Sequence, residues 1–414
     1  SPFPPHCLSS PPSTAAYIMD LKVNFSGRAL DYTEEEIAVV LEALRKADPL
    51  TQGAYQIAFQ EKFRKFNGAK HAFAMMNGTA ALEVAAQLCR LKQGDEVVIP
   101  SHTFTSSAYP FARTGAKLVW ADIHRDTRVV DAGCIERVLS PRTKVIIVVH
   151  LYGYVADMPA IMKLAGERGI LVVEDACQAI GADIGGVKAG NFADFGIFSF
   201  HSHKNLTTLG EGGMITVRDD RYAAIIPMLR HNGHCAFPGE RPDYWKPAMG
   251  NVDFPELDGE RLWPNNYCLG EVECALGAKQ LDRVPEINAE KRTRALAFID
   301  ALAGYPELVF HRVDTTRHNY HLLAARMDGS VERRDDFMRR MFYEHGVKCV
   351  VQYCPLNRYP LYQKLGFGQA DCPNGDEFFD HMISFPFQHN LTEAEFDHML
   401  QAAKTVLDQQ RAGK

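Results

Sequence analysis

Several features that mark particular classes of protein are missing from this chain of 414 residues. No uncharged apolar run reaches the roughly 18 residues that a transmembrane helix needs, so we expect no membrane span. Lys and Arg number 45 against 51 Asp and Glu, a net charge of −6. The chain therefore lacks the overall basic charge that is typical of nucleic-acid-binding proteins. Hydrophobic residues make up 46% and charged residues 23%, a balance that excludes global disorder, a collagen-like fibre and a coiled coil.

Short motifs of several common enzymes are absent too. The sequence contains no HExxH, no GxSxG and no P-loop motif, so a zinc protease, an α/β-hydrolase and a P-loop enzyme are not indicated. The ten cysteines form no CxxC pair, and several of them, such as Cys89 and Cys274, lie in periodic apolar segments. We therefore expect free thiols in a reducing cytoplasm and no bound metal.

Short segments rich in Val and Ile alternate with helix-like segments through the middle of the chain. The expected strands are residues 71–76, 96–100, 117–123, 144–150, 170–175, 195–200 and 213–217. This alternation is typical of a mostly parallel sheet that is covered by helices on both faces. We therefore predict an α/β fold whose large, ligand-binding domain spans about residues 50–280.

The pattern changes after a helical stretch over residues 270–304. Strands are expected at 320–327 and 348–353, with a helix at 333–345 between them, and a terminal helix should begin at the capping box that starts with Thr392. Residues 281–414 are therefore predicted to form a smaller α+β domain.

The N-terminal part of the chain reads as two pieces. Residues 1–18 are rich in Pro and Ser, and we expect a disordered leader or an expression remnant, with Met19 as a candidate natural start. Residues 19–49 contain a capping box at Thr33 ahead of an apolar run, so a helix is expected there. We expect this segment to pack on the small domain.

Two short stretches in the first half of the chain have residues that suit an anionic cofactor. Gly78 and Thr79 lie between an expected strand and a helix, where free N–H groups can hold a phosphate. Asp175 ends a buried strand, at the edge where open α/β sheets bind ligands, and its burial requires a cationic partner. Taken alone, the first stretch is also a glycine turn with a Thr cap, and Asp175 could equally cap the next helix.

A lysine and a glycine-rich turn follow the strand at 195–200. Lys204 lies in a small polar segment with Ser199 and Ser202, flanked by histidines. A desolvated lysine has a lowered pKa and can form a Schiff base. The turn at 210–213 contains three glycines, which allows a close backbone approach. Taken alone, the lysine could be a solvated loop residue and the turn a simple hairpin.

Together these parts match what a pyridoxal phosphate (PLP) enzyme needs. The cofactor has a phosphate to anchor and an aldehyde to tether to a lysine. Its pyridine nitrogen must stay protonated, which a carboxylate ensures. A phosphate site at a helix start, Asp175 and Lys204 would supply these three functions.

Longer segments show a resemblance to a known family. These are NGTAAL, PSHTFTSSAYPFARTGAKLVWADI, HLYGYVADMPAI, VVEDACQAIGA, FSFHSHKNLTTLGEGGMITV, NNYCLGEVECALGAKQLDRV and HGVKCVVQYCPLNRYPLY. In this order they resemble the DegT/StrS-type sugar aminotransferases, which are fold-type I PLP enzymes, over about residues 35–410. The resemblance implies a large domain with a mostly parallel seven-stranded sheet and a smaller C-terminal α+β domain.

The resemblance also implies a role for individual residues. Lys204 matches the lysine that holds the cofactor and moves a proton, and Asp175 matches the acid on the pyridine nitrogen. Gln178 matches a residue near the phenolic oxygen, and Phe104 matches the ring that stacks on the cofactor. Phosphate contacts match Gly78, Thr79, Ser199 and, reaching over from a neighbouring subunit, Asn266. A homodimer with shared active sites is therefore expected.

The family implies an aminotransferase that moves an amino group from glutamate or glutamine to a keto or aldehyde sugar, usually nucleotide-linked, by a ping-pong mechanism. Members with His in place of the lysine are sugar dehydratases instead, but the motif match places Lys204, and neither His201 nor His203, at the cofactor position. The resemblance leaves open two other acceptors, a free sugar acid (such as an octulosonate) and a cyclitol. It also leaves open a non-catalytic relative that binds PLP.

The segment 230–263 looks longer than is usual in the family. It combines basic residues with aromatic ones such as Tyr244, Trp245 and Trp263, a mixture that can hold an anionic, ring-bearing substrate. An ordinary surface loop explains the same composition.

Overall fold

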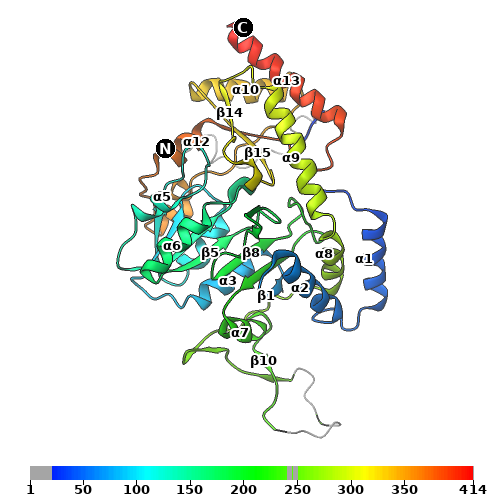
Figure 1. The fold of residues 1–414 in the computed structure, drawn as a ribbon, viewed down its shortest axis with the longest axis vertical. Helices are drawn as coiled ribbons and strands as arrows, with labels where there is room; N and C mark the ends of the chain where they lie inside the picture. Colours follow the sequence, from blue (N-terminus) through cyan, green and yellow to red (C-terminus); the bar gives the residue numbers. More distant parts are fainter. Residues whose placement is uncertain (1–20, 240–244, 246–249, 414) are drawn as a thin grey trace.

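The computed structural model describes residues 21–239, 245 and 250–413 (Figure 1). The leader expected at 1–18 lies outside these residues. A seven-stranded sheet forms the centre of the molecule, in the strand order β1-β9-β8-β5-β4-β2-β3. The strands are β1 (His71–Met75), β2 (Glu96–Pro100), β3 (Lys117–Ala121), β4 (Thr143–Val149), β5 (Leu171–Asp175), β8 (Phe195–Ser199) and β9 (Gly213–Val217).

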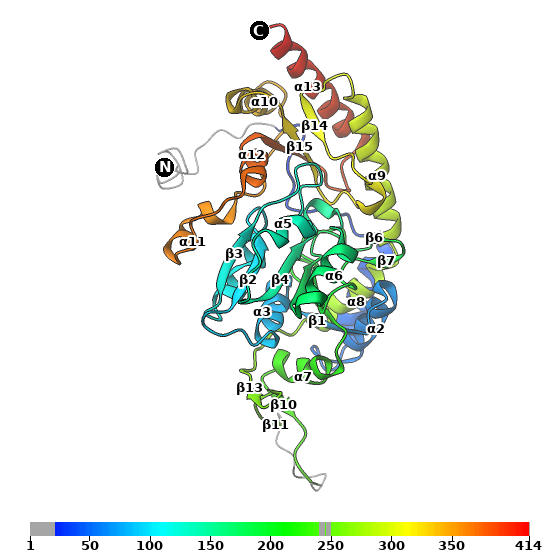
Figure 2. The ribbon, with the colours of Figure 1, turned by 60° about the vertical axis from the view of Figure 1, so that its left-hand side comes forward.

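All seven strands lie where the sequence predicts them, and the predicted sheet is confirmed. Only β9 is antiparallel to its neighbours, β1 and β8, whereas the other pairs are parallel. The central strands are buried on both faces, which explains their nearly continuous apolar sequences. Helices lie on both sides of the sheet, as Figure 2 shows most clearly. The helices that precede, connect or follow these strands along the chain are α2 (Ala54–Asn67), α3 (Gly78–Leu88), α4 (Tyr109–Ala112), α5 (Ala132–Glu136), α6 (Met158–Arg168) and α7 (Asp220–Arg230).

A second, smaller sheet follows the helices α8 (Glu271–Gln280) and α9 (Val284–Ala301). These two helices occupy the predicted helical stretch. Pro285 lies in the first turn of α9, where the N–H that proline lacks would have no partner within the helix. The small sheet is antiparallel, in the order β14-β15-β16. Its strands and covering helices are β14 (Leu308–Phe310), β15 (Leu323–Met327), β16 (Met382–Phe385), α10 (Val331–Tyr343), α12 (Pro373–His381) and α13 (Glu393–Arg411).

The strand predicted at 348–353 is wrong. That segment makes only one isolated bridge, between Val350 and Ser384, and β16 takes the place beside β15. The physical reason is that the chain leaves the sheet after Val350. Gln352 and Tyr353 line a cavity, and Leu356 donates its N–H to the carbonyl of Ser101 at 2.7 Å.

The N-terminal segment contacts two parts of the molecule. Val23 is buried in the apolar cluster of the small sheet, and its N–H bonds to the carbonyl of Gly346. Helix α1 (Glu34–Lys46) begins at the predicted capping box of Thr33 but packs against α8. Arg283 holds the buried Glu36 of α1 at 2.8 Å. The domain limits at residues 50 and 280 stay a prediction.

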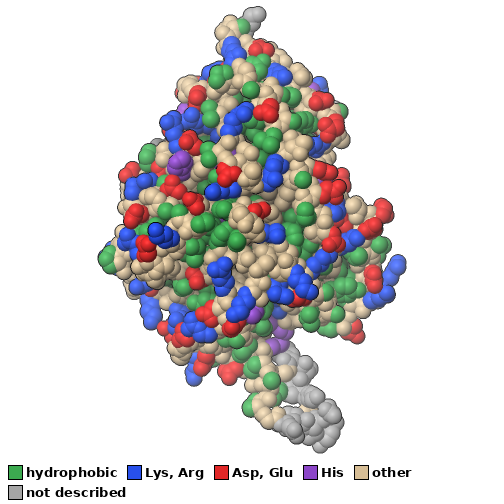
Figure 3. Space-filling view, in the orientation of Figure 1, with side chains coloured by type: hydrophobic (Ala, Val, Ile, Leu, Met, Phe, Trp, Pro, Cys, Tyr) green, Lys and Arg blue, Asp and Glu red, His purple; other side chains and the backbone are tan. Residues whose placement is uncertain are grey.

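Smaller elements complete the fold. They are α11 (Pro360–Lys364) and three strand pairs, β6 (Asp183–Ile184) with β7 (Val187–Lys188), β10 (His234–Cys235) with β11 (Asn251–Val252), and β12 (Glu256–Leu257) with β13 (Glu260–Arg261). The last two pairs form an arm that projects from the body beyond α7 (Figures 1 and 2). Acidic and basic side chains are interspersed on the face in Figure 3, as expected from the small net charge. Within the described ranges, no helix combines the length and the apolar character that crossing a membrane requires.

Candidate active site

A cavity of about 500 Å³ opens where β5 and β8 end and α3 begins, a size that is ordinary for a small-molecule site. Its wall also includes the N-terminal segment near Phe25 and parts of the small domain near Phe387. Seven of the eight predicted site residues line it, namely Gly78, Thr79, Phe104, Asp175, Gln178, Ser199 and Lys204. Asn266 is not in the wall of this chain's cavity, and its predicted role in a neighbouring subunit stays a prediction.

The start of α3 forms a cradle with no side chain in it. Asn77 caps the helix by accepting the N–H of Ala80 at 2.8 Å. A Cβ atom on Gly78 would lie 3.0 Å from Sγ of Cys177 and 3.2 Å from Cβ of Ser199, so glycine lets the start of α3 lie this close to the residues that end β5 and β8. Gly78 and Thr79 line the cavity, and the N–H groups of a first helical turn suit a phosphate.

Two further contacts fix this cradle. The hydroxyl of Thr79 donates to Oγ of Ser106 at 2.9 Å. On the other side, a Cβ atom on Gly213 would lie 2.5 Å from the carbonyl carbon of Asn77 and 2.8 Å from the N atom of Gly78. The last glycine of the predicted turn therefore lets β9 approach the start of α3 directly.

Asp175 is a buried carboxylate, 5% exposed, at the end of β5. Ser107 donates to its Oδ2 at 2.6 Å, and the N–H of Cys177 donates to its Oδ1 at 3.1 Å. The salt bridges found in the described part of the chain include none to Asp175. A buried carboxylate with hydrogen bonds but no protein cation is suited to a cationic ligand group.

Lys204 shares the cavity with Asp175. Burial lowers the pKa of the Lys204 amine, while Cys177 and Asp175 nearby oppose this shift. A lowered pKa leaves a larger share of the amine neutral at physiological pH, and the neutral amine is the nucleophile that a carbonyl requires. The structure thus brings Lys204 and Asp175 into the wall of one cavity, and the cofactor roles of both residues stay a prediction.

Gln178 connects the segment after β5 with two other segments of the chain, at Tyr152 and Tyr353. Its Oε1 accepts the N–H of Tyr152 at 2.6 Å, and its Nε2 donates to the hydroxyl of Tyr353 at 3.2 Å. Burial raises the pKa of Tyr353 to about 12, so this phenol keeps its proton. The ring of Tyr353 meets that of Phe104 edge to face, with centroids 5.7 Å apart. Phe104 itself is 49% exposed and presents a ring to the cavity.

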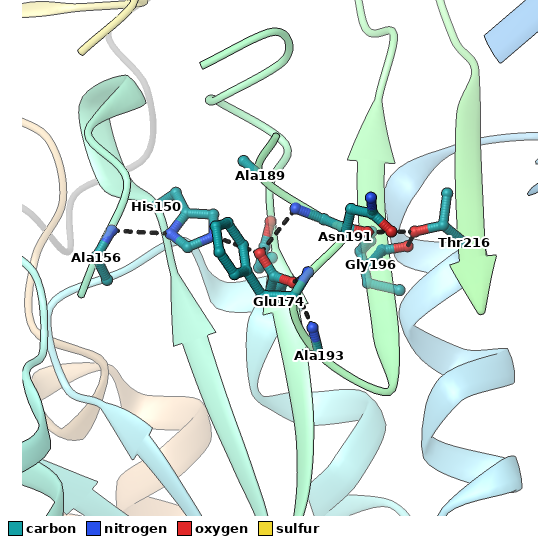
Figure 4. Close-up of polar contacts among 12 residues, drawn as sticks. His150, Ala156, Glu174, Ala189, Asn191, Ala193, Gly196 and Thr216 are labelled. Carbon is teal, nitrogen blue, oxygen red and sulfur yellow. Dashed lines mark hydrogen bonds and ion pairs between the residues drawn. The ribbon is translucent and has the colours of Figure 1, made fainter. Parts of the chain in front are cut away.

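Beside Asp175, the preceding residue Glu174 is fully buried in a separate network (Figure 4). Its carboxylate accepts the N–H groups of Gly190, Phe192 and Ala193 at 2.7 Å and lies 3.0 Å from Nε2 of His150. Because Nδ1 of His150 accepts the N–H of Ala156, the ring proton lies on Nε2 and points to the carboxylate. This network attaches β5 to the segment that leads into β8.

Sequence reasoning missed four residues of this site. Ser106 and Ser107 hold Thr79 and Asp175, Tyr353 closes the wall near Gln178, and Lys291 lines the cavity from α9. The two serines lie within the HTFTSS motif, which was a usable signal. Tyr353 lies in the segment HGVKCVVQYCPLNRYPLY, which was a usable signal too, whereas nothing near Lys291 in the sequence distinguishes it.

Of the segment 230–263, the described residues (230–239, 245 and 250–263) contribute nothing to this chain's own cavity wall. Arg230 is buried and bonds to Gln60 and to the carbonyl of Ala74. Trp263 is 74% exposed and meets the ring of Phe254 at 5.0 Å. The predicted Tyr244 lies outside the described residues, and a substrate contact by this segment stays a prediction.

Comparisons with known proteins agree with this geometry. The model of the DegT/DnrJ/EryC1/StrS aminotransferase family matches residues 31–404. GDP-perosamine synthase of Caulobacter vibrioides is 32% identical over 389 residues, which cover 93% of this chain and 98% of the relative. L-glutamine:2-deoxy-scyllo-inosose aminotransferase of Streptomyces paromomycinus is 33% identical over 75% of this chain and 72% of the relative.

Solved structures show the same likeness. The putative sugar aminotransferase Spr1654 of Streptococcus pneumoniae, in its pyridoxamine phosphate (PMP) form, superposes with a TM-score of 0.80 at 27% identity. The superposition covers 93% of this chain and 100% of that one. The PLP form of the same protein also gives a TM-score of 0.80.

Fold, cavity and comparisons together define a PLP-dependent transaminase with a fold-type I architecture. The chain belongs to the DegT/DnrJ/EryC1/StrS aminotransferase family, whose model matches most of its length.

Proposed function

We propose that this transaminase moves the amino group of glutamate or glutamine to the keto or aldehyde carbon of a sugar, in two half-reactions at one site. The observation that carries the proposal is the shared cavity of Lys204, Asp175 and the start of α3. Curated relatives named for perosamine and scyllo-inosose chemistry support a sugar or cyclitol acceptor, and we favour a nucleotide-linked sugar.

The residues of the cavity fit the cofactor. The side-chain-free cradle at Gly78, with Thr79 and Ser199 beside it, is suited to the phosphate. Asp175 has the location and the unpaired charge to hold a protonated pyridine nitrogen, and Phe104 presents a ring for stacking. When bound, PLP supplies an electron sink for the substrate carbon.

Lys204 is the proton carrier in this proposal. Its lowered pKa provides a neutral amine that would hold the cofactor by its aldehyde. Once the amine of the substrate has displaced it from that carbon, the same amine would be free to take the proton of the substrate carbon and return it one position away. Ser107 and the N–H of Cys177 hold the Asp175 carboxylate in place throughout. Gln178 is placed to contact the phenolic oxygen, and Tyr353 supports its amide.

The proposed active form is a homodimer in the cytoplasm. Asn266 lies outside its own cavity wall and next to the projecting arm, where it forms a bridge with His231. That location is consistent with a contact to the phosphate bound in a second copy.

Borohydride reduction of the holoenzyme, followed by peptide mass mapping, tests the proposal. The cofactor tag is expected on Lys204, and Lys204→Ala should abolish it together with amine transfer. Lys70→Ala, which removes an exposed lysine paired with Asp220, is the control and should keep both. A tag on another residue would contradict the lysine assignment.

Glutamate alone separates an aminotransferase from a non-catalytic relative, and added sugar substrate then identifies a dehydratase. An aminotransferase converts the bound cofactor to its amine form, which absorbance follows directly. A non-catalytic relative would bind PLP and leave the spectrum unchanged. A dehydratase would release a deoxy sugar with no net amine transfer.

A further inference from the structure

Lys291 is a second lysine in the wall of the cavity, and the cofactor roles proposed above do not use it. It lies on α9, one helix of the small domain, and is 3% exposed. Its Nζ donates to the carbonyl of Phe387 at 2.5 Å and lies 4.7 Å from the centre of that residue's ring. A lysine ammonium has three donors, so one carbonyl leaves this group with unused capacity.

No carboxylate balances this charge in the described part of the chain. No acid there lies within 4.0 Å of the Lys291 amine. Of the two acids in the cavity wall, Asp175 is held by Ser107 and Cys177, and Glu211 is largely exposed, 3.8 Å from Nε2 of His201. A buried cation without a counter-charge is costly, and burial lowers the pKa of Lys291 to about 7.

Lys291 also lies near the reacting amine. Lys204, Lys291 and His321 all line one cavity, and burial, with a smaller effect of the two lysines, holds the pKa of His321 well below its usual range. An anion bound at Lys291 would therefore lie in the space that the substrate must enter to reach Lys204.

We propose that Lys291 binds a carboxylate group of the substrate. The carboxylate is either that of the amino-acid donor or that of a sugar acid acting as acceptor. Both would place an anion at the buried amine of Lys291 on α9, which has no counter-charge among the described residues and whose charged form the anion would stabilise. This inference rests on the proposed aminotransferase function, whose own test at Lys204 is separate.

The test measures ligand binding to the PLP holoenzyme by calorimetry, with 2-oxoglutarate and gluconate as the two probes. Lys291→Gln removes the charge but keeps a donor for the carbonyl of Phe387, and Lys291→Arg keeps the charge. We expect Lys291→Gln to weaken binding of at least one probe tenfold or more, and Lys291→Arg to restore most of it. Loss for 2-oxoglutarate assigns the donor carboxylate, and loss for gluconate assigns a sugar acid.

Two outcomes would overturn the proposal. Unchanged affinity for both probes in Lys291→Gln would show that the lysine holds no substrate carboxylate. Weaker binding of PLP itself, with unchanged affinity for both probes at saturating cofactor, would make Lys291 a residue of the cofactor site. Lys279→Gln, on α8 outside the cavity, is the matched control and should change neither. Borohydride mapping of each variant reports separately whether Lys204 still carries the cofactor.

Discussion

The hydroxyl of Ser107 lies 2.6 Å from Oδ2 of Asp175 and donates to it. The acid at the end of β5 is thus held from a loop after β2, 68 residues earlier in the chain. A hydrogen bond to a charged group contributes about 1.5–3 kcal/mol, so the serine helps to fix the orientation of this carboxylate in the cavity wall.

Replacing Ser107 with Ala should therefore weaken cofactor binding. We expect the Kd for PLP to rise about tenfold, which corresponds to about 1.4 kcal/mol, because Asp175 loses one of its two hydrogen bonds. Titration of the apoenzyme with PLP measures this change. Ser107→Thr should restore affinity, whereas Ser101→Ala, another buried serine nearby, should have no effect. Equal Kd values for Ser107→Ala and the unchanged protein would contradict the positioning role.

A methyl group at Gly78 should close the cradle at the start of α3. The added Cβ would meet Cys177 and Ser199 at 3.0–3.2 Å, so Gly78→Ala should reduce the affinity for PLP by at least tenfold. Gly166→Ala is the matched control, since no atom lies within 4 Å of the added group. In the helix α6, that change should stabilise the fold by about 0.5–1 kcal/mol. A Gly78→Ala enzyme with normal PLP affinity would place the phosphate elsewhere.

The buried Glu174 should matter for stability more than for chemistry. In Glu174→Gln, an amide N–H₂ group would face backbone N–H groups that donate to the carboxylate in the unchanged protein. Because donors would then face donors in a buried site, we expect the free energy of unfolding to fall by about 3 kcal/mol. Urea unfolding of the holoenzyme measures it. Glu136→Gln, at an exposed ion pair with Arg168, should leave the free energy of unfolding nearly unchanged. Equal stability of the two variants would contradict the role of the network.

Buried histidines should make the fold sensitive to acid. Burial lowers the pKa of His102 to about 3 and that of His311 to about 4, from an ordinary value of 6.5. The unfolded chain therefore binds more protons, so the contribution of these rings is complete above pH 6.5 and is lost as pH falls toward 4. Each ring should lower the free energy of unfolding by up to about 1.4 kcal/mol per pH unit in that range.

Urea unfolding at about pH 7.5 and about pH 5 tests this expectation. His311→Gln cannot titrate, and it should lose about 2 kcal/mol less between the two pH values than the unchanged protein does. The same loss in both proteins would show that His311 does not contribute to the pH dependence.

The central sheet could be predicted because its strands are buried on both faces and therefore read as apolar runs between turns. The strands of the small sheet were harder to predict from the sequence. β16 has only four residues, Met382–Phe385, which are too few for a periodic pattern. Residues 348–353 have the composition of a strand, but Gln352 and Tyr353 line the cavity instead, and Tyr353 accepts a hydrogen bond from Gln178. Which of the two segments pairs with β15 depends on contacts with residues far away in the chain, and a local sequence pattern does not contain that information.

The same limit applies to the site. Lys204 and Asp175 each follow a strand of the main sheet, so the topology alone brings them to one edge. Lys291 sits in the run EKRTR on α9, which reads as a solvated helix face, and its burial is set by Phe387, 96 residues later. The role predicted for Asn266 depends on a second copy of the chain, which no local sequence pattern describes.

The direct approach of β9 to α3 at Gly213 leaves no room for a side chain at that residue. Backbone meets backbone there, so an enlargement of the site for a bulkier acceptor is better sought at side chains of the cavity wall, such as Phe387 and Phe25. An engineer who wishes to change what this enzyme accepts should build the library on those positions and keep the glycine fixed.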